Sequence, residues 1–140
     1  MIDGYHVGVC RTAVVGEAPP HAERIWASLV ACKKLLLEVM AAGASTRWIY
    51  DVYLKKLSEL DLPPISFIAH GMGLHLHEDP YLGPTPDQSL EAGMVLAFEP
   101  LVFETGCNFG MQIKDVVLIN EGGCELLSDF TNTDRLITVS

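Results

Sequence analysis

Three histidines, His70, His75 and His77, fall within eight residues of one another, and the carboxylate Glu78 follows directly. A second carboxylate, Glu99, comes at the end of an apolar run. Imidazole and carboxylate groups bind transition metals and transfer protons near neutral pH. These two segments therefore predict a reaction centre or a metal site.

Structural alternatives exist for each of these residues. His70 lies between two small residues, where it could be an ordinary hydrogen-bonded strand histidine. His75 and His77 are two residues apart, so on a strand they would share a face and form either a weak metal-binding pair or a solvated surface. For His75 we favour the surface. A carboxylate among apolar residues is costly to bury unless it is paired, so Glu99 is expected to be a site residue or half of an ion pair.

Two helices are expected before the histidine segment. From His21, apolar residues recur every three or four positions behind prolines that suit a first helical turn, and Gly43 is the expected C-cap. Ser45 or Thr46 can cap the second helix, which must stop before Pro63-Pro64.

The remaining elements read as strands. β-Branched and apolar runs predict strands over 5–15, 65–72, 94–104 and 109–120, with short pieces at 125–127 and 136–139. The proline-rich stretch 78–87 is expected to be a loop, and 120–123 a hairpin turn. Gly71 and Gly73 are expected to allow a close backbone approach at a bulge rather than to form a nucleotide loop. Two helices followed by a curved, mainly antiparallel sheet give an α+β class.

Composition limits the size and the partners. A chain of 140 residues, 49% hydrophobic, suffices for one domain or part of one. A net charge of -9, with nine scattered Lys and Arg residues, argues against nucleic acid and anionic membranes as partners. No apolar run reaches the length of a membrane span, and no secretory leader opens the chain. The cysteines lack C-x-x-C spacing and read as reduced side chains of a soluble cytoplasmic protein: Cys10, Cys32, Cys107 and Cys124.

The order and spacing of the two chemical segments resemble the pita-bread family of Xaa-Pro peptidases, methionine aminopeptidases and creatinase. Gly4-Tyr5 and Arg11-Thr12 upstream and the run 112–115 downstream fit the same pattern, which covers nearly the whole chain. The resemblance implies that the chain is a partial catalytic domain over residues 1–140. It matches the second half of the fold plus the last strand of the first half, without the amino-terminal part.

The resemblance also assigns site residues. Metal-dependent members hold two divalent ions, Mn, Co or Zn, with two aspartates, one histidine and two glutamates. His70 matches the histidine ligand, Glu99 the first glutamate, and His77 a further histidine that touches substrate. The position of one aspartate is Gly8, the position of the last glutamate is Lys114, and the second aspartate would precede the first residue of this sequence.

These departures predict that no metal cofactor binds. Glycine offers no ligand, and the Lys114 ammonium places a positive charge where a dication would lie. Asp115 cannot substitute, because neighbouring strand residues point to opposite faces. We hypothesise that the Lys114 ammonium lies against Glu99 and replaces the missing cation.

The sequence therefore predicts a Xaa-Pro peptidase or creatinase-like hydrolase domain that is inactive as a metallopeptidase on its own. The alternative is a non-catalytic peptide-binding or assembly module derived from the same fold. Expected ligands are small molecules or proline-containing peptides. An incomplete domain exposes apolar surface, so a homodimer or larger self-assembly is expected. The candidate catalytic residues are His70, His77 and Glu99, and the candidate substrate-pocket residues are Lys114, His75 and Arg11, where Arg11 either anchors an anionic group or stacks over the sheet.

Overall fold

A computed structural model describes residues 3–105 and 109–140. Two helices, α1 (Pro20–Val39) and α2 (Thr46–Glu59), follow the first short strand and precede the others. The strands are β1 (Ala13–Val15), β2 (Ala69–Gly71), β3 (Glu78–Leu82), β4 (Val95–Phe98), β5 (Leu101–Val102), β6 (Met111–Gln112), β7 (Asp115–Asn120), β8 (Gly123–Leu126) and β9 (Ile137–Val139).

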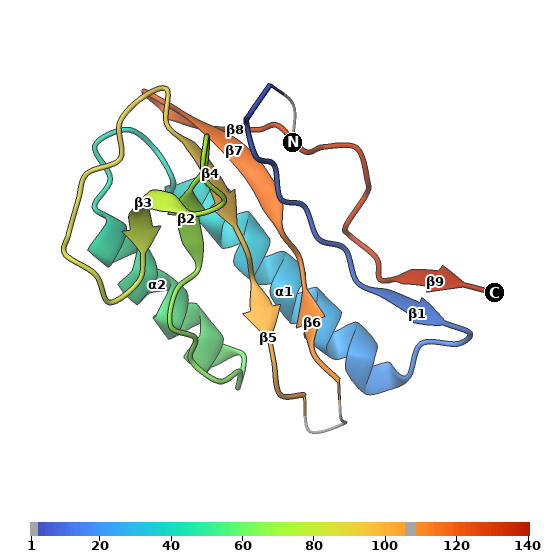
Figure 1. Ribbon diagram of the computed structural model, residues 1–140. Helices are drawn as coiled ribbons and strands as arrows, with labels where there is room; N and C mark the ends of the chain where they lie inside the picture. Colours follow the sequence, from blue (N-terminus) through green and yellow to red (C-terminus); the bar gives the residue numbers. More distant parts are fainter. Residues whose placement is uncertain (1–2, 106–108) are drawn as a thin grey trace.

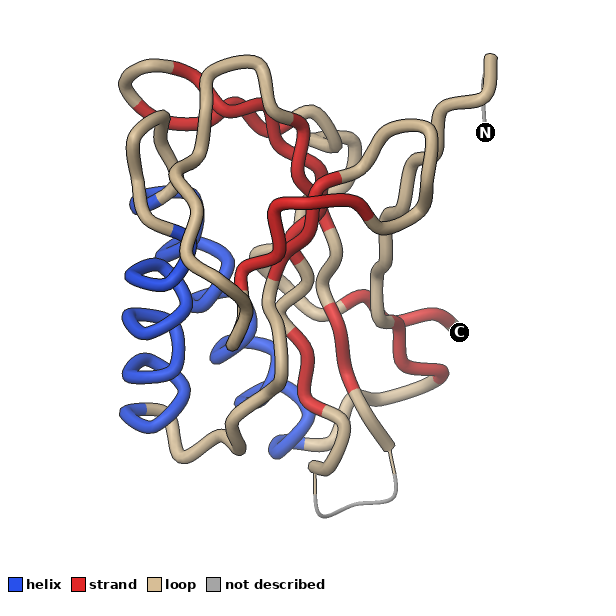
Figure 2. Tube along the Cα trace, turned by 60° about the vertical axis from the view of Figure 1, so that its left-hand side comes forward, coloured by secondary structure: helices blue, strands red, loops and turns tan. Residues whose placement is uncertain are grey.

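The main sheet has five strands in the order β3-β2-β4-β7-β8, and each neighbouring pair is antiparallel. Strands β5 and β6 form a separate antiparallel pair, while β1 and β9 pair in parallel. Both helices lie behind the sheet in Figure 1, and Figure 2 shows helices and strands as two layers. The expected α+β class, with two helices on a mainly antiparallel sheet, is confirmed. Among the described residues, neither helix is long and apolar enough to cross a membrane.

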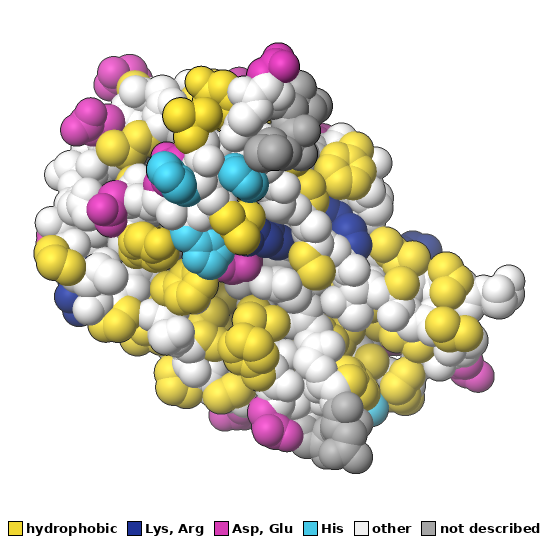
Figure 3. Space-filling view, viewed as in Figure 1, with side chains coloured by type: hydrophobic (Ala, Val, Ile, Leu, Met, Phe, Trp, Pro, Cys, Tyr) yellow, Lys and Arg dark blue, Asp and Glu magenta, His cyan; other side chains and the backbone are white. Residues whose placement is uncertain are grey.

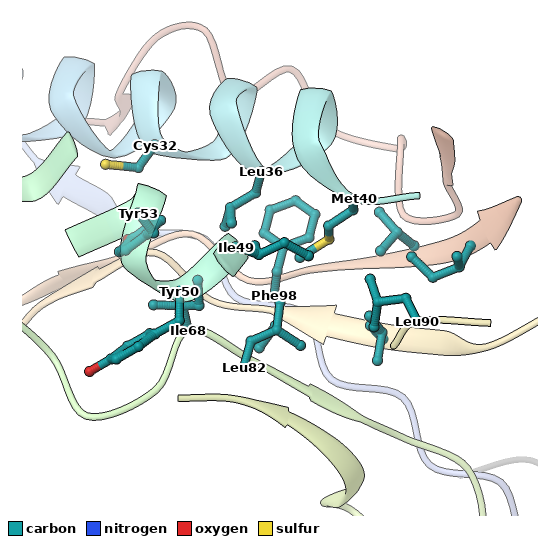
Figure 4. Close-up of a cluster of buried hydrophobic side chains, with 14 of the residues drawn as sticks. Cys32, Leu36, Met40, Ile49, Tyr50, Tyr53, Ile68, Leu82, Leu90 and Phe98 are labelled. Atoms are coloured by element: carbon teal, nitrogen blue, oxygen red, sulfur yellow. The ribbon is translucent and has the colours of Figure 1, made fainter. Parts of the chain in front are cut away.

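The main core lies between the helices and the sheet (Figure 4). Leu36 and Met40 come from the first helical segment, Ile49 and Tyr53 from α2, and Phe98 from the central strand β4; none is more than 1% exposed. Their spacing of three or four residues on the helices aligns these side chains on one face. The predicted helical patterns therefore identified the apolar faces correctly.

The helix ends differ in how well they were predicted. Ser45 caps α2 as expected, because its side-chain oxygen accepts a hydrogen bond from the backbone N–H of Trp48 at 3.0 Å. The C-cap of α1 is Met40, so the prediction of Gly43 was wrong. Gly43 instead forms the turn after the helix with φ of +84°, and its N–H donates to the carbonyl of Leu90.

The loop predicted over 78–87 was partly wrong, because Glu78–Leu82 forms β3 at the edge of the sheet. Proline is compatible with an edge strand, where one side needs no backbone donor, so Pro80 did not exclude pairing. The predicted strand over 65–72 shortens to three residues. His75 and His77 lie in the turn before β3 and not on a strand, so the predicted shared strand face is absent.

Gly71 confirms the expected close backbone approach. The pairing of β2 with β3 shifts register between His70 and Gly71, and a Cβ atom on Gly71 would lie 2.3 Å from the carbonyl oxygen of Asp79. No side chain fits there.

The amino-terminal strand predicted over 5–15 is mostly unpaired. Only Ala13–Val15 forms a strand, and Cys10 makes an isolated bridge to Lys114. β-Branched residues favour an extended backbone, but a strand also requires a neighbouring backbone to pair with. The bridge nevertheless brings Gly8 and Arg11 close to the start of β7. Of the four cysteines, Cys10, Cys32 and Cys124 are free thiols and Cys107 lies outside the described residues.

Candidate functional site

Three adjacent strands bring His70, Glu99 and Lys114 together on the sheet face opposite the helices. His70 pairs with Ala97 across β2 and β4, and Ala97 pairs with Val116 across β4 and β7. Because alternate residues share a face, Glu99, two residues after Ala97, and Lys114, two residues before Val116, join His70 on one side. Figure 3 shows histidine side chains gathered beside acidic and basic side chains on this face.

The Lys114 ammonium is the centre of this cluster. Its Nζ lies 3.2 Å from Glu99 Oε2 and 3.1 Å from His70 Nε2. The predicted contact between the Lys114 ammonium and Glu99 is confirmed. Glu99 is only 9% exposed, so its charge needs a partner. Gln112 adds to the pairing, since its Nε2 donates to Glu99 Oε2 at 3.0 Å.

Hydrogen bonds define the protonation of His70. Its Nδ1 lies 2.8 Å from the carbonyl oxygen of Gly71, which can only accept, so Nδ1 carries the hydrogen. Nε2 then holds the lone pair that accepts from Lys114. Burial lowers the pKa of His70, and the Lys114 ammonium acts in the same direction. A neutral His70 does not form an ion pair with Glu99, whose Oε1 is 3.7 Å from Nε2; Lys114 bridges the two side chains.

His77 approaches the cluster from the turn before β3. Its ring centroid lies 4.0 Å from that of His70, and Phe67 and Tyr81 lie edge-on to it at 6.0 and 6.4 Å. His77 and Glu99 line a cavity of about 330 Å³. The other walls of this cavity come from Ile65, Ser66, Phe67, Leu101, Phe103 and Gln112. The arrangement offers an imidazole, a carboxylate and an apolar wall to a small ligand.

Gly8 lies directly beside Lys114. A Cβ atom on Gly8 would lie 3.0 Å from Lys114 Cε and 3.4 Å from Nζ. The contact with Cε is tighter than an ordinary van der Waals distance, so a side chain at residue 8 would require Lys114 to shift by a few tenths of an ångström. The resemblance placed both residues at ligand positions of one site, but it did not show that they pack against each other.

Asp115 points to the other face of β7, as strand alternation predicted. It is fully buried and accepts hydrogen bonds from Lys33, Arg11 and Ser128. Asp115 is therefore a buried, paired charge and not a solvent-facing one. Sequence reasoning also missed Lys33, although its place within the apolar stripe of α1 was a signal that it would be buried and paired.

Arg11 and His75 do not join the cluster. The Arg11 guanidinium bonds to Asp115 and to the carbonyl of Lys114, and it stacks over Phe130 with 5.3 Å from Cζ to the ring centroid. Arg11 therefore anchors the anionic Asp115, which is one of the two predicted alternatives, and it is not among the residues that line the cavity with His77 and Glu99. The side chain of His75 is 83% exposed. Its backbone N–H donates to Glu78 Oε1 at 2.6 Å and thereby lowers the pKa of that carboxylate, so His75 belongs to a surface turn.

His70, His77 and Glu99 each present one ligand atom within 4.8 Å of the other two. By residue type they could hold a single metal ion. However, the only lone pair of His70 Nε2 accepts from the Lys114 ammonium, and the same ammonium is paired with Glu99. The observed arrangement therefore does not fit a metal ion, because one ligand atom is occupied and a positive charge already lies between the others.

The chain was compared with known protein families and structures. The model of metallopeptidase family M24 matches residues 1–121. The "Probable dipeptidase PepE" of Mycobacterium tuberculosis is 28% identical over 139 residues, which are 98% of this chain and 37% of that protein. The "Xaa-Pro dipeptidase" of Pyrococcus furiosus is 28% identical over 137 residues, 96% of this chain and 38% of that protein.

A solved structure agrees with these relatives. The recombinant prolidase of Thermococcus sibiricus superposes with a TM-score of 0.85 at 29% identity, covering 97% of this chain and 37% of that one. The chain therefore spans little more than a third of the length of the proteins it matches. A two-metal site such as the pita-bread resemblance implies does not fit the residues present, because Gly8 and Lys114 stand at two of its ligand positions.

Proposed function

Because the chain belongs to metallopeptidase family M24, we propose that it is a prolidase-like domain that binds short proline-containing peptides and lacks metallopeptidase activity of its own. The observation that carries this proposal is the position of Lys114, whose Nζ lies 3.1 Å from His70 and 3.2 Å from Glu99. An ammonium group at this point opposes a dication, both by repulsion and by occupying the lone pair of His70 Nε2. We expect no metal cofactor.

The cavity supports a peptide ligand of this kind. Phe67, Leu101 and Phe103 provide an apolar wall suited to a proline ring, while His77 and Glu99 provide polar groups that can bond an amide or an amino terminus. We choose proline-containing peptides because a relative of this chain is named Xaa-Pro dipeptidase. We propose the same class of ligand, short proline-containing peptides, for any longer protein that contains this chain.

The proposal is tested with the purified chain and Xaa-Pro dipeptides. Calorimetric titration should show saturable binding, and Phe67→Ala should weaken it about tenfold, by about 1.4 kcal/mol. Trp48→Ala is the matched control, because Trp48 is an aromatic residue, 50% exposed, on α2 away from the cavity. Hydrolysis assays with added manganese or cobalt should show no stimulated cleavage. Robust metal-dependent cleavage by the wild-type chain would overturn the proposal.

A second candidate is metal-free hydrolysis of a C–N bond. It is favoured by His77, whose ring centroid lies 4.0 Å from that of His70 and which lines the cavity with Glu99. In this reading His77 transfers the proton, because both ring nitrogens of His70 are engaged, and Glu99 orients a cationic or amide substrate. Turnover in the presence of a chelator, lost in His77→Ala and retained in His75→Ala, would favour this candidate over binding alone.

We also propose a cytoplasmic location. The three cysteines within the described ranges are free thiols, and a free thiol persists most readily in a reducing compartment. Fractionation of the source cells with an antibody against the chain tests this directly.

A further inference from the structure

We infer that Lys114 is a built-in cation that closes the cluster of His70 and Glu99 to divalent metal ions, and that Gly8 provides the space it needs. This inference rests on the proposed function and attributes the expected lack of metal binding to Lys114 and Gly8. It concerns metal binding, which can be measured without any assay of activity.

Lys114 and a metal ion would compete for the same side chains. The ammonium lies 3.1 Å from Nε2 of His70, whose lone pair accepts from it, and forms an ion pair of 3.2 Å with Oε2 of Glu99. Imidazole nitrogen and carboxylate oxygen are the atoms that bind a transition metal when these side chains act as ligands. The side chains of Lys114 and Glu99 are only 12% and 11% exposed, so water replaces this ion pair poorly.

The position of Lys114 depends on the residue at position 8. A Cβ atom at Gly8 would lie 3.0 Å from Lys114 Cε, so a side chain at residue 8 would displace the end of the lysine by a few tenths of an ångström. The absence of a side chain at Gly8 therefore leaves room for the observed Lys114 conformation. The two residues that distinguish this cluster from a metal centre form one packed unit.

Removal of the Lys114 side chain leaves the potential metal ligands in place. His70, His77 and Glu99 still present three ligand atoms within 4.8 Å of one another. Three protein ligands suffice for one ion with an open position. We therefore expect the removal of Lys114 to open a site for a single ion, and a carboxylate at residue 114 to strengthen it.

The test is equilibrium dialysis with Co²⁺ and Zn²⁺, combined with visible absorption of the cobalt form, which reports the ligand set. Wild type and the control Lys34→Met, which removes a lysine whose side chain is 64% exposed, should bind no ion at this cluster. Lys114→Met should bind one ion at a concentration at least tenfold below the highest one at which wild type still shows no binding. Lys114→Glu should exceed Lys114→Met by a further factor of about ten. Lys114→Gln, which keeps a donor for Glu99, is the substitute if Lys114→Met does not fold.

Two further variants locate the ion. In the Lys114→Met background, His77→Ala should abolish binding while His75→Ala should leave it unchanged. The inference is overturned if wild type binds an ion as tightly as the folded Lys114 variants, or if His75→Ala removes the ion. Failure of the proposed function is a separate result, because it requires metal-dependent cleavage of Xaa-Pro peptides by the wild-type chain.

Discussion

Lys33 and Asp115 form a buried ion pair, with 2.8 Å between Nζ and Oδ2, that joins α1 to the start of β7. Asp115 is completely buried and also bonds to Arg11 and Ser128. Lys114, its neighbour in the chain, reaches Glu99 on the opposite face of the sheet. The buried pair therefore fixes the strand from which Lys114 projects into the candidate site.

The stability of the chain should fall in acid because of Asp115. Burial raises the pKa of this carboxyl, but hydrogen bonds from Lys33, Ser128 and Arg11 outweigh burial and hold the pKa below its ordinary value. A folded pKa below the unfolded value of about 3.9 stabilises the folded state at higher pH, and this stabilisation is lost as the pH falls through the folded pKa. Urea unfolding followed between about pH 5 and about pH 2 should show this loss.

Asp115→Asn provides the comparison. It should lower the free energy of unfolding at neutral pH by about 3 kcal/mol, since it leaves the buried Lys33 and the half-buried Arg11 without their counter-charge. It should also remove part of the acid dependence. Asp51→Asn, at an exposed position on α2, should do neither. An unchanged acid dependence in Asp115→Asn would contradict the assignment.

The spacing of apolar residues and the residues typical of turns predicted the helices and the mainly antiparallel sheet. They also predicted the bulge at Gly71 and the opposite directions of Lys114 and Asp115. These features depend on local geometry, which a sequence carries directly. The pattern could not show that Pro80 lies in an edge strand, since edge position depends on the order of strands in space. It also could not show that Gly8 touches Lys114 or that Lys33 reaches Asp115, because both contacts join segments far apart in the chain.

The contributions of Lys114 and Glu99 to the free energy of unfolding should be coupled, because the two side chains form an ion pair. Lys114→Met leaves a nearly buried carboxylate without its cation and should lower the free energy of unfolding by about 3 kcal/mol. Lys114→Met combined with Glu99→Gln should cost clearly less than the sum of the two single changes. A double-mutant cycle from urea unfolding measures this difference. Additive effects within about 0.5 kcal/mol would mean that the two side chains do not interact in solution.

Gly71→Ala should destabilise the chain strongly, because the new Cβ atom would lie 2.3 Å from the carbonyl oxygen of Asp79 in a pairing that cannot move apart freely. Forcing an extra carbon into packed structure costs about 1 to 3 kcal/mol. Gly122→Ala is the matched control, since a Cβ atom there meets nothing within 4 Å. Thermal unfolding should separate the two variants, and equal midpoints would contradict the close approach at Gly71.

Self-association should depend on the apolar side chains of the amino-terminal segment. Tyr5, Val7 and Phe130 are 61%, 60% and 68% exposed, and they line an apolar groove of about 350 Å³ together with Met72 and Val95. Exposed apolar surface of this kind favours burial against a second copy. Sedimentation velocity should therefore show a dimer or larger species for wild type, shifted toward monomer by Val7→Ser. Trp48→Ser, on the helical face, should leave the distribution unchanged. A stable wild-type monomer at high concentration would show that this groove does not drive assembly.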